Sequence, residues 1–300
     1  MKNFTKPRLC IAVLLAISCN GIAEKTVDTG NGQIPQMQVD SLLLNISFLP
    51  ECHLPHPDST GLINGLDIFI YRTEGTRELE YHEHFDGFPD SLEIKVSEGG
   101  KIVAAICNFP YTFNLEALRK FDSMSLLSLG PDDENKNSPM LSGNIEIPST
   151  GNGIIPVSLH LTPLLCCVRI TAVSNALDGY ELLENPRVRL SGRNPEAEIM
   201  RADGFRPKEA MSDSEPVPLP YDIGFYTQEP GIDLFCYPND TPEDVLGTSR
   251  TGIDFECEIE GRTCIFTERL PPFGRGSFLQ AELTVLSPDE AIWKVEILQE

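Results

Sequence analysis

Histidine is the side chain of this 300-residue chain best suited to acid–base chemistry or metal binding near neutral pH. The sequence contains no G-x-S-x-G nucleophile motif, no H-E-x-x-H zinc motif and no glycine-rich phosphate-binding loop. These absences give no support to an enzyme and indicate no cofactor. The five histidines that remain to be explained are His53, His56, His82, His84 and His160.

His82 and His84 are the histidine pair with the most suggestive spacing. On a strand, residues i and i+2 point to the same face, so both imidazoles could reach one metal ion, with a third ligand still to be found. We favour a simpler interpretation, a polar strand edge exposed to solvent. The segment 52–57 (CHLPHP) also holds two histidines, but its prolines indicate a structural loop.

Seven cysteines follow the N-terminal segment, at positions 52, 107, 166, 167, 236, 257 and 264. Because this number is odd, at least one thiol must be unpaired, and those in apolar runs are expected to be buried thiols. Cys257 and Cys264 would face each other if Glu260-Gly261 formed a tight hairpin turn. This register permits a disulfide, in a hydrogen-bonded pair with the wider Cα spacing, unless a bulge at Gly261 breaks it.

Residues 1–23 are predicted to be a secretory signal, because a basic start precedes the short apolar run 9–17. The stretch 15–19 (LAISC) resembles a bacterial lipobox, which would make Cys19 a lipidated N-terminus. The alternative is ordinary cleavage after Ala23. Asn20, which follows Cys19, by resemblance to other bacterial lipoproteins permits transfer to the outer membrane. Residues 24–37 are polar and are predicted to form a flexible tether.

The composition excludes one class of partner and one class of fold. The formal charge is −22, and removal of residues 1–23, which contain basic but no acidic side chains, makes it more negative. Such a chain repels phosphate backbones, so we expect no nucleic-acid binding. The 24 prolines and 23 glycines break helices and favour short strands joined by turns.

Apolar residues beyond the tether alternate with a period of two, which predicts an all-β protein. We expect two tandem β-sandwich domains, at residues 38–163 and 164–300, and one helix beginning at Asn114. Residues 130–139 are predicted to form an exposed loop. The expected strands cover residues 42–48, 66–71, 92–96, 101–107, 145–147, 157–161, 168–172, 188–190, 223–225, 234–236, 253–259, 264–266, 279–285 and 293–297.

Four Asp-Ser dipeptides stand before a third residue that completes a possible modification triplet. They resemble the O-glycosylation triplet of Bacteroides-type exported proteins. The alternative for each is an ordinary Asp-Ser turn or helix cap. The candidate serines are Ser41, Ser59, Ser91 and Ser123.

Four segments, taken in order, resemble a known family. Residues 138–143 (SPMLSG) resemble a segment late in the first domain of fimbrillin-type proteins. Residues 156–171 resemble the strand pair that leads into their second domain, 233–239 (DLFCYPN) a tyrosine-rich strand, and 269–285 their closing strand. In 233–239, Cys-Tyr-Pro replaces the usual tyrosine-rich stretch. The chain thus resembles the fimbrillin superfamily of Bacteroidales, nearest its FimB-type anchor subunits.

The resemblance implies two transthyretin-like domains and a structural role in adhesion, with other fimbrial subunits as partners through strand exchange. In polymerising members of this family, cleavage after an arginine beyond the first strand opens the acceptor groove. Here no arginine occurs between Arg8 and Arg72. We therefore expect strand 42–48 to stay attached, as in an anchor or terminal subunit.

Two rival functions are weighed against this one. A surface glycan-binding lipoprotein of a polysaccharide-uptake system would present aromatic rings in its loops. The single tryptophan, Trp293, lies in a terminal strand instead, which counts against that function. A secreted hydrolase would need paired carboxylates, and no spacing among the 45 acidic residues singles out a pair.

Overall fold

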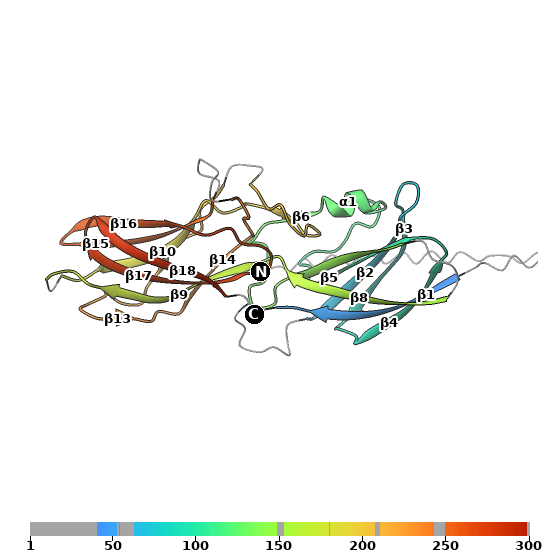
Figure 1. Cartoon of the computed structure of the whole chain (residues 1–300), viewed down its shortest axis with the longest axis horizontal. Helices are drawn as coiled ribbons and strands as arrows, with labels where there is room; N and C mark the ends of the chain where they lie inside the picture. The colour runs from blue at the N-terminus through green and yellow to red at the C-terminus, as the bar shows by residue number, and fades with distance from the viewer. Residues whose placement is uncertain are drawn as a thin grey trace, which may run out of the picture. The chain divides into compact units, whose positions relative to one another are not determined.

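The computed structural model describes residues 41–52, 54, 63–148, 153–179, 181–207, 211–242 and 250–298 (Figure 1). Residues 39–300 belong to one compact unit. The described part is built almost wholly of strands, with one short helix, α1 (Phe121–Ser125), in its first half. The prediction of an all-β fold with one short helix is therefore confirmed.

Two sheets that share strand β8 (Gly153–Pro163) form the first half of the unit. One runs β8-β1-β4 and the other β3-β2-β5-β7-β8. Because β7 pairs with β8 through two residues alone, the sheets diverge and enclose a core between them. The other strands are β1 (Ser41–Pro50), β2 (Gly65–Arg72), β3 (Leu79–Asp86), β4 (Ser91–Ser97), β5 (Lys101–Cys107) and β7 (Leu141–Ile147).

The outer face of β2 and β5 is covered as well, by α1 and the chain that leads to it. Phe69 and Tyr71 point to this face and pack with Leu118 and Met124. The helix predicted at Asn114 is misplaced, since Asn114 caps a single turn and α1 begins at Phe121. Backbone hydrogen bonds from the β2–β3 connection to residues 119–121 interrupt the helix there.

The second half contains two further sheets, in the orders β12-β10-β15-β16 and β13-β9-β17-β18, with β14 on the other part of β9. The predicted strand 223–225 is wrong, because only Ile223 makes a bridge and Phe225 is exposed. The strands are β9 (Cys166–Asn175), β10 (Glu184–Ser191), β12 (Val217–Pro218), β13 (Thr227–Gln228), β14 (Ile232–Cys236), β15 (Gly252–Ile259), β16 (Arg262–Arg269), β17 (Phe278–Ser287) and β18 (Glu290–Leu298).

The buried residues fall into three clusters that reflect this division. One cluster draws on residues 42–161, a second on residues 166–285, and the third contains residues of both halves. The short strands β6 (Ser128–Leu129) and β11 (Ala197–Glu198) also pair across the halves. We propose that residues 38–163 and 164–300 are two domains joined by this third cluster.

Candidate functional site

Strand β1, the strand expected to fill its own groove, is an inner strand of the first sheet. It pairs antiparallel with β4, from Ser41 opposite Ser97 onwards, and parallel with β8 as far as Pro50 opposite Leu161. Its alternate side chains are buried against the first core. Those side chains are Leu42, Leu44, Ile46 and Phe48. Both edges of β1 are thus hydrogen-bonded within the same chain.

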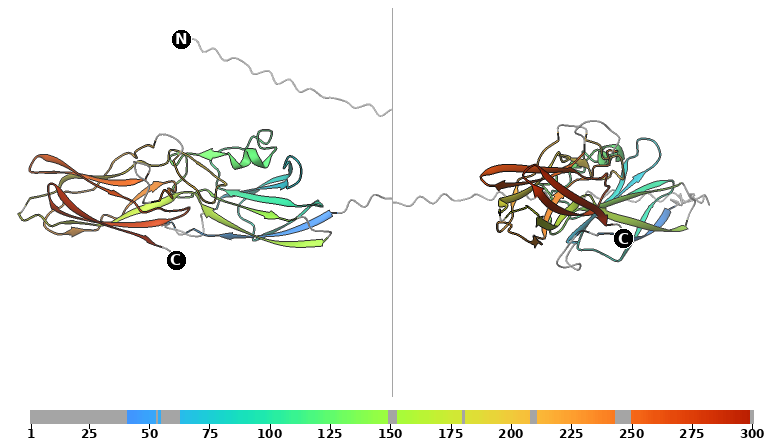
Figure 2. Two further views of the ribbon diagram at one scale, coloured as in Figure 1. Left: turned by 45° about the horizontal axis from the view of Figure 1, so that its top comes forward. Right: turned by 60° about the vertical axis from the view of Figure 1, so that its left-hand side comes forward.

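Strand β18 presents the opposite situation, because it pairs with β17 on one side and is the last strand of its sheet (Figures 1 and 2). Trp293 and Val295 pack against the second core. Ile292, on the other face, is 57% exposed. Lys294 forms an ion pair with Glu296 at 3.0 Å, which places charge beside the open edge. An open edge of this kind can accept a strand from another chain.

The guanidinium of Arg275 joins the two halves through five hydrogen bonds. It donates to the backbone oxygens of Ile199 and Arg201 in the second half, at 3.2 and 3.0 Å. In the first half it donates to the oxygen and Oγ of Ser142 and to the oxygen of Thr162, at 3.3, 2.7 and 2.7 Å. Burial lowers the pKa of Arg275 to about 10. Its acceptors are uncharged, so removing the side chain leaves several oxygens without this donor.

Glu134 makes a second link between the halves. Its Oε1 accepts a hydrogen bond from the Tyr237 hydroxyl at 2.7 Å, and its Oε2 accepts one from the Met140 backbone N–H at 3.0 Å. Glu134 is 6% exposed, so the prediction of an exposed loop over 130–139 is wrong at this residue. The loop is partly buried because Tyr237, distant in sequence, packs onto it.

Burial raises the pKa of Glu134 to about 7, although its hydrogen bonds and Arg275 act in the opposite direction. In the window from about pH 4.5 to 7 the folded chain holds a proton that the unfolded chain has released. The free energy of unfolding should therefore fall by up to about 3 kcal/mol as the pH rises through this window. Glu134→Gln should remove most of that decline, measured by urea denaturation across the window.

A matched variant separates this effect from other titrating groups. Glu116 lies exposed in the turn before α1, so Glu116→Gln should keep the pH dependence of the unchanged chain. If the free energy of unfolding fell equally with pH in Glu134→Gln and Glu116→Gln, Glu134 would not titrate in this window.

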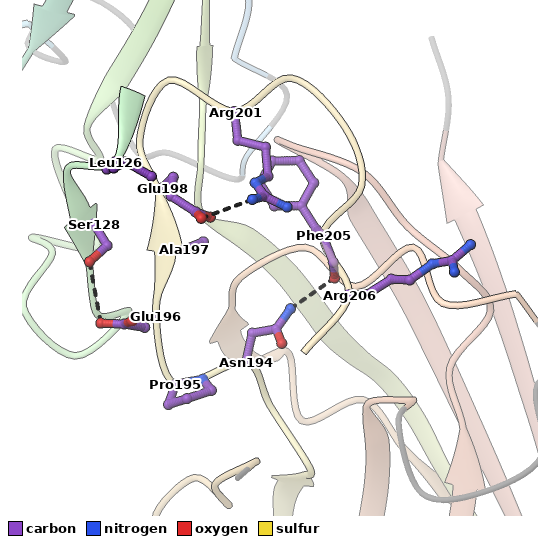
Figure 3. A pocket seen from close by; sticks show the side chains of 10 residues that line it. All are labelled: Leu126, Ser128, Asn194, Pro195, Glu196, Ala197, Glu198, Arg201, Phe205 and Arg206. Atoms are coloured by element: carbon purple, nitrogen blue, oxygen red, sulfur yellow. Dashed lines mark hydrogen bonds and ion pairs between the residues drawn. The ribbon is translucent and has the colours of Figure 1, made fainter. Parts of the chain in front are cut away.

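A small cleft lies beside the paired strands β6 and β11 (Figure 3). Three contacts close its walls: Asn194 to the Phe205 backbone oxygen, Arg201 to Glu198, and Ser128 to Glu196. Its volume is about 140 Å³, well below the 300–1,000 Å³ or so of ordinary ligand sites. We assign it no ligand.

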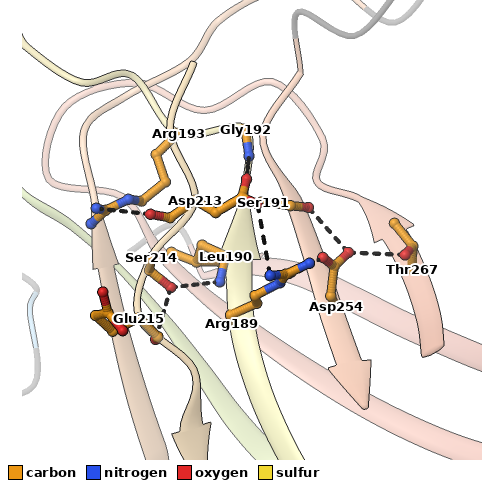
Figure 4. A network of polar contacts seen from close by, with 10 residues as sticks. All are labelled: Arg189, Leu190, Ser191, Gly192, Arg193, Asp213, Ser214, Glu215, Asp254 and Thr267. Atoms are coloured by element: carbon orange, nitrogen blue, oxygen red, sulfur yellow. Dashed lines mark hydrogen bonds and ion pairs between the residues drawn. The ribbon is translucent and has the colours of Figure 1, made fainter. Parts of the chain in front are cut away.

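A polar network fixes the segment 211–215 onto strands β10 and β15 (Figure 4). Asp254 accepts hydrogen bonds from Arg189, Ser191 and Thr267, at 3.1, 3.1 and 2.9 Å. The Ser214 hydroxyl accepts one from the Leu190 backbone N–H. Each named group already has a partner within the fold, so the network explains the position of this segment and indicates no chemistry.

The hairpin that carries Cys257 and Cys264 forms as predicted. Glu260 and Gly261 have φ values of 52° and 75°, as a type I′ turn requires, and Cys257 stands opposite Cys264 in the register. Both side chains are buried, and both cysteines are free thiols in this structure. The disulfide between them stays a prediction.

The other predicted site residues are scattered. Ser91 begins β4 and Ser123 lies in α1, both exposed, while Ser41 begins β1 and is half-buried. Cys19, Ser59, His53 and His56 lie outside the described residues, as do the signal and tether. Within the described ranges, no three His, Cys, Asp or Glu side chains are placed to hold a metal ion. Among the same residues, no helix is long and apolar enough to cross a membrane.

His82 and His84 lie on one face of β3, as their spacing predicted. Their common partner is Asp67 of β2, whose carboxylate oxygens are 3.0 Å from His82 Nε2 and 2.9 Å from His84 Nδ1. The sequence-based search for a third group stayed within the local strand and missed this residue. The strand-edge interpretation is supported, because β3 is the outermost strand of its sheet.

Comparison with solved structures finds proteins that share this fold. No protein-family model and no curated protein matches the sequence. A candidate cell adhesion protein from Parabacteroides distasonis is similar at a TM-score of 0.66 and 12% identity, over 87% of this chain and 97% of that one.

Two Porphyromonas gingivalis proteins are similar as well. The fimbrilin FimA has a TM-score of 0.59 and 8% identity, over 83% of this chain and 91% of its own. The tip fimbrial protein Mfa3, in a C-terminally truncated form, has a TM-score of 0.55 and 11% identity, over 86% of this chain and 98% of its own. At such identities the likeness concerns the fold, and it supports the family resemblance of the sequence at that level.

Proposed function

We propose that this chain is a non-enzymatic structural subunit of a cell-surface fimbria that serves in cell adhesion. The observation that carries the proposal is the fold, which a fimbrilin and a tip fimbrial protein share over most of their length. The absence of catalytic motifs from the sequence agrees with a structural role.

The subunit is an anchor or terminal subunit, nearest the FimB type, rather than a repeating shaft subunit. Its first strand is hydrogen-bonded on both sides within its own sheet. The segment between β1 and β2 contains no arginine at which that strand could be cut off. A groove that stays filled accepts no donor strand from a neighbour, so growth ends at that face.

Contact with the neighbouring subunit is made through the C-terminal strand. β18 is an outermost strand of the second half and carries an exposed apolar side chain, Ile292. Main-chain hydrogen bonds along such an edge supply affinity, and alternate side chains supply fit.

Electron microscopy of fimbriae from the native bacterium, labelled with antibody against this chain, tests the role. We expect label at fimbrial ends, and its loss in Ile292→Lys, which replaces the exposed apolar side chain at the edge with a further charge. Ile154→Lys is the matched control, because Ile154 is 67% exposed on β8, which belongs to another sheet than β18. Periodic label along the shaft, or none on fimbriae, would contradict the proposal.

Lipid on Cys19 holds the subunit on the outer membrane. Two or more acyl chains are enough for stable anchoring, since each buried methylene contributes about 0.8 kcal/mol. Mass spectrometry of the native N-terminus should find acylated Cys19, and Cys19→Ala should move the protein from the membrane to the soluble fraction. Asn20→Ala is the control and should stay membrane-bound. An unmodified N-terminus at Glu24 would disprove the anchor.

A further inference from the structure

A cavity of about 590 Å³ lies at the end of strands β2 and β3, where the cover over their outer face stops. Asp67, His82 and His84 contribute from the sheet, and the chain after β5 contributes Tyr111. Asp133 and Asn135 contribute from the loop before β7. We name this cavity the β3 pocket. Its volume falls within the range of about 300–1,000 Å³ that small-molecule sites occupy.

One wall of the β3 pocket consists of polar groups held in fixed positions. Asp67 accepts a hydrogen bond from each imidazole, His82 at 3.0 Å and His84 at 2.9 Å. Phe69 packs against the His82 ring, with 4.5 Å between ring centroids. Asp67 takes one nitrogen of each ring, and the other nitrogen of His84 lies 3.5 Å from an Asp86 carboxylate oxygen. The second nitrogen of His82 therefore remains for a ligand.

An aromatic wall supports an exposed ring. Phe109 stacks on Phe113, with 4.3 Å between centroids and 11° between planes, and Tyr111 meets Phe109 edge-on at 5.9 Å. Phe113 in turn contacts Phe69 of β2. The Tyr111 hydroxyl hydrogen-bonds to Asp133, a contact that raises the pKa of Tyr111. Phe109 and Asp133 thus hold the Tyr111 ring in place. Tyr111 is nevertheless 55% exposed, so its ring is accessible to a ligand.

These two walls match the chemistry of an uncharged sugar. A sugar ring presents C–H groups to an aromatic face and hydroxyl groups, each both donor and acceptor, to planar polar side chains. Anionic sugars are disfavoured by Asp67, Asp133 and the net charge of −22. Cations are disfavoured because Asp67 already binds two imidazoles, and hydrogen bonding to it raises the pKa of His84.

We propose that the β3 pocket binds a neutral saccharide of one or two rings, stacked on Tyr111 and hydrogen-bonded to the His82–Asp67–His84 group. The proposal does not depend on a fimbrial role, because no residue of β1 or β18 lines the pocket. The position of the single tryptophan gives no indication of this site, because the aromatic side chains of the pocket are phenylalanine and tyrosine.

Saturation-transfer NMR of the purified protein tests the pocket with five disaccharides: lactose, maltose, cellobiose, N,N′-diacetylchitobiose and α-1,6-mannobiose. At least one should bind, and Tyr111→Ala should weaken its binding about tenfold. Tyr111→Phe keeps the ring and should weaken it less. Tyr221→Ala is the matched control, because Tyr221 is 52% exposed outside the pocket, and it should leave binding unchanged.

A second readout follows the imidazoles. The bound sugar should shift the ring NMR signals of His82 and His84 and leave that of His160, which pairs with Glu51 outside the pocket, in place. The proposal is wrong if no disaccharide binds at about 10 mM, or if binding is indifferent to Tyr111→Ala. It is also wrong if Nα-acetyl-lysine amide binds there and no sugar does.

Discussion

Replacing Arg275 with alanine is expected to lower the free energy of unfolding by about 3 kcal/mol, because hydrogen bonds from a charged donor are lost together. The five acceptor contacts come from strands β7 and β8 and from residues 199–201, so they tie the two halves together. In the variant, these oxygens must find water or remain unsatisfied within a junction that is closed by apolar side chains.

Arg262 provides the comparison that isolates burial from charge. It forms an ion pair with Asp289, but the two side chains are 61% and 74% exposed. Exposed pairs of this kind contribute at most about 1 kcal/mol. Arg262→Ala and Arg275→Ala remove the same side chain from an exposed and a buried site. Urea denaturation measures the free energy of unfolding of each variant. Equal losses in the two variants would mean that Arg275 does not hold the halves together.

Sequence periodicity predicted the strands well wherever one face of the sheet is buried. The alternation over 42–48 and the continuous apolar run 101–107 both correspond to strands with the expected burial, β1 and β5. Lys101 is the exception within that run: it is fully buried, and its Nζ lies 3.1 Å from a Glu80 oxygen. That ion pair depends on strand order, which local patterning does not encode.

Contacts between distant segments cannot be predicted from local sequence patterns for the same reason. Strand β3 carries half-buried and exposed side chains without a clear alternation, so only its two histidines indicate an exposed strand edge in the sequence. Asp67 and Tyr111 lie in different elements, and each by itself has the pattern of an ordinary surface residue. Only the order β3-β2-β5 brings them to one pocket.

Burial at the junction between the halves also depends on contacts that local sequence does not predict. Glu134 belongs to a segment whose acids, asparagines and prolines predict an exposed loop. Tyr237 lies about a hundred positions further along the chain, and its hydroxyl reaches Glu134 through the third buried cluster. Residues that a single half would leave exposed are therefore buried once the second half folds.

Strand β1 should contribute heavily to stability if it permanently fills its own groove. Ile46→Ala is expected to lower the free energy of unfolding by about 2–5 kcal/mol, because Ile46 is fully buried between the two sheets. Asn45→Ala, one residue earlier on the exposed face of the same strand, should change it by less than about 0.5 kcal/mol. Similar values for both would indicate that β1 is loosely held.

The same strand decides whether the subunit ends a fimbria or extends it. If β1 stays attached, protein recovered from assembled fimbriae should begin at or before Glu24 and contain residues 41–50, as N-terminal sequencing and peptide mass spectrometry would show. The first arginines after β1 are Arg72, the last residue of β2, and Arg77, which follows that strand. A cut there would remove β1 and β2 and much of the first core. Recovery of chains that begin after either arginine would therefore overturn the terminal-subunit assignment, because such a chain has an open groove.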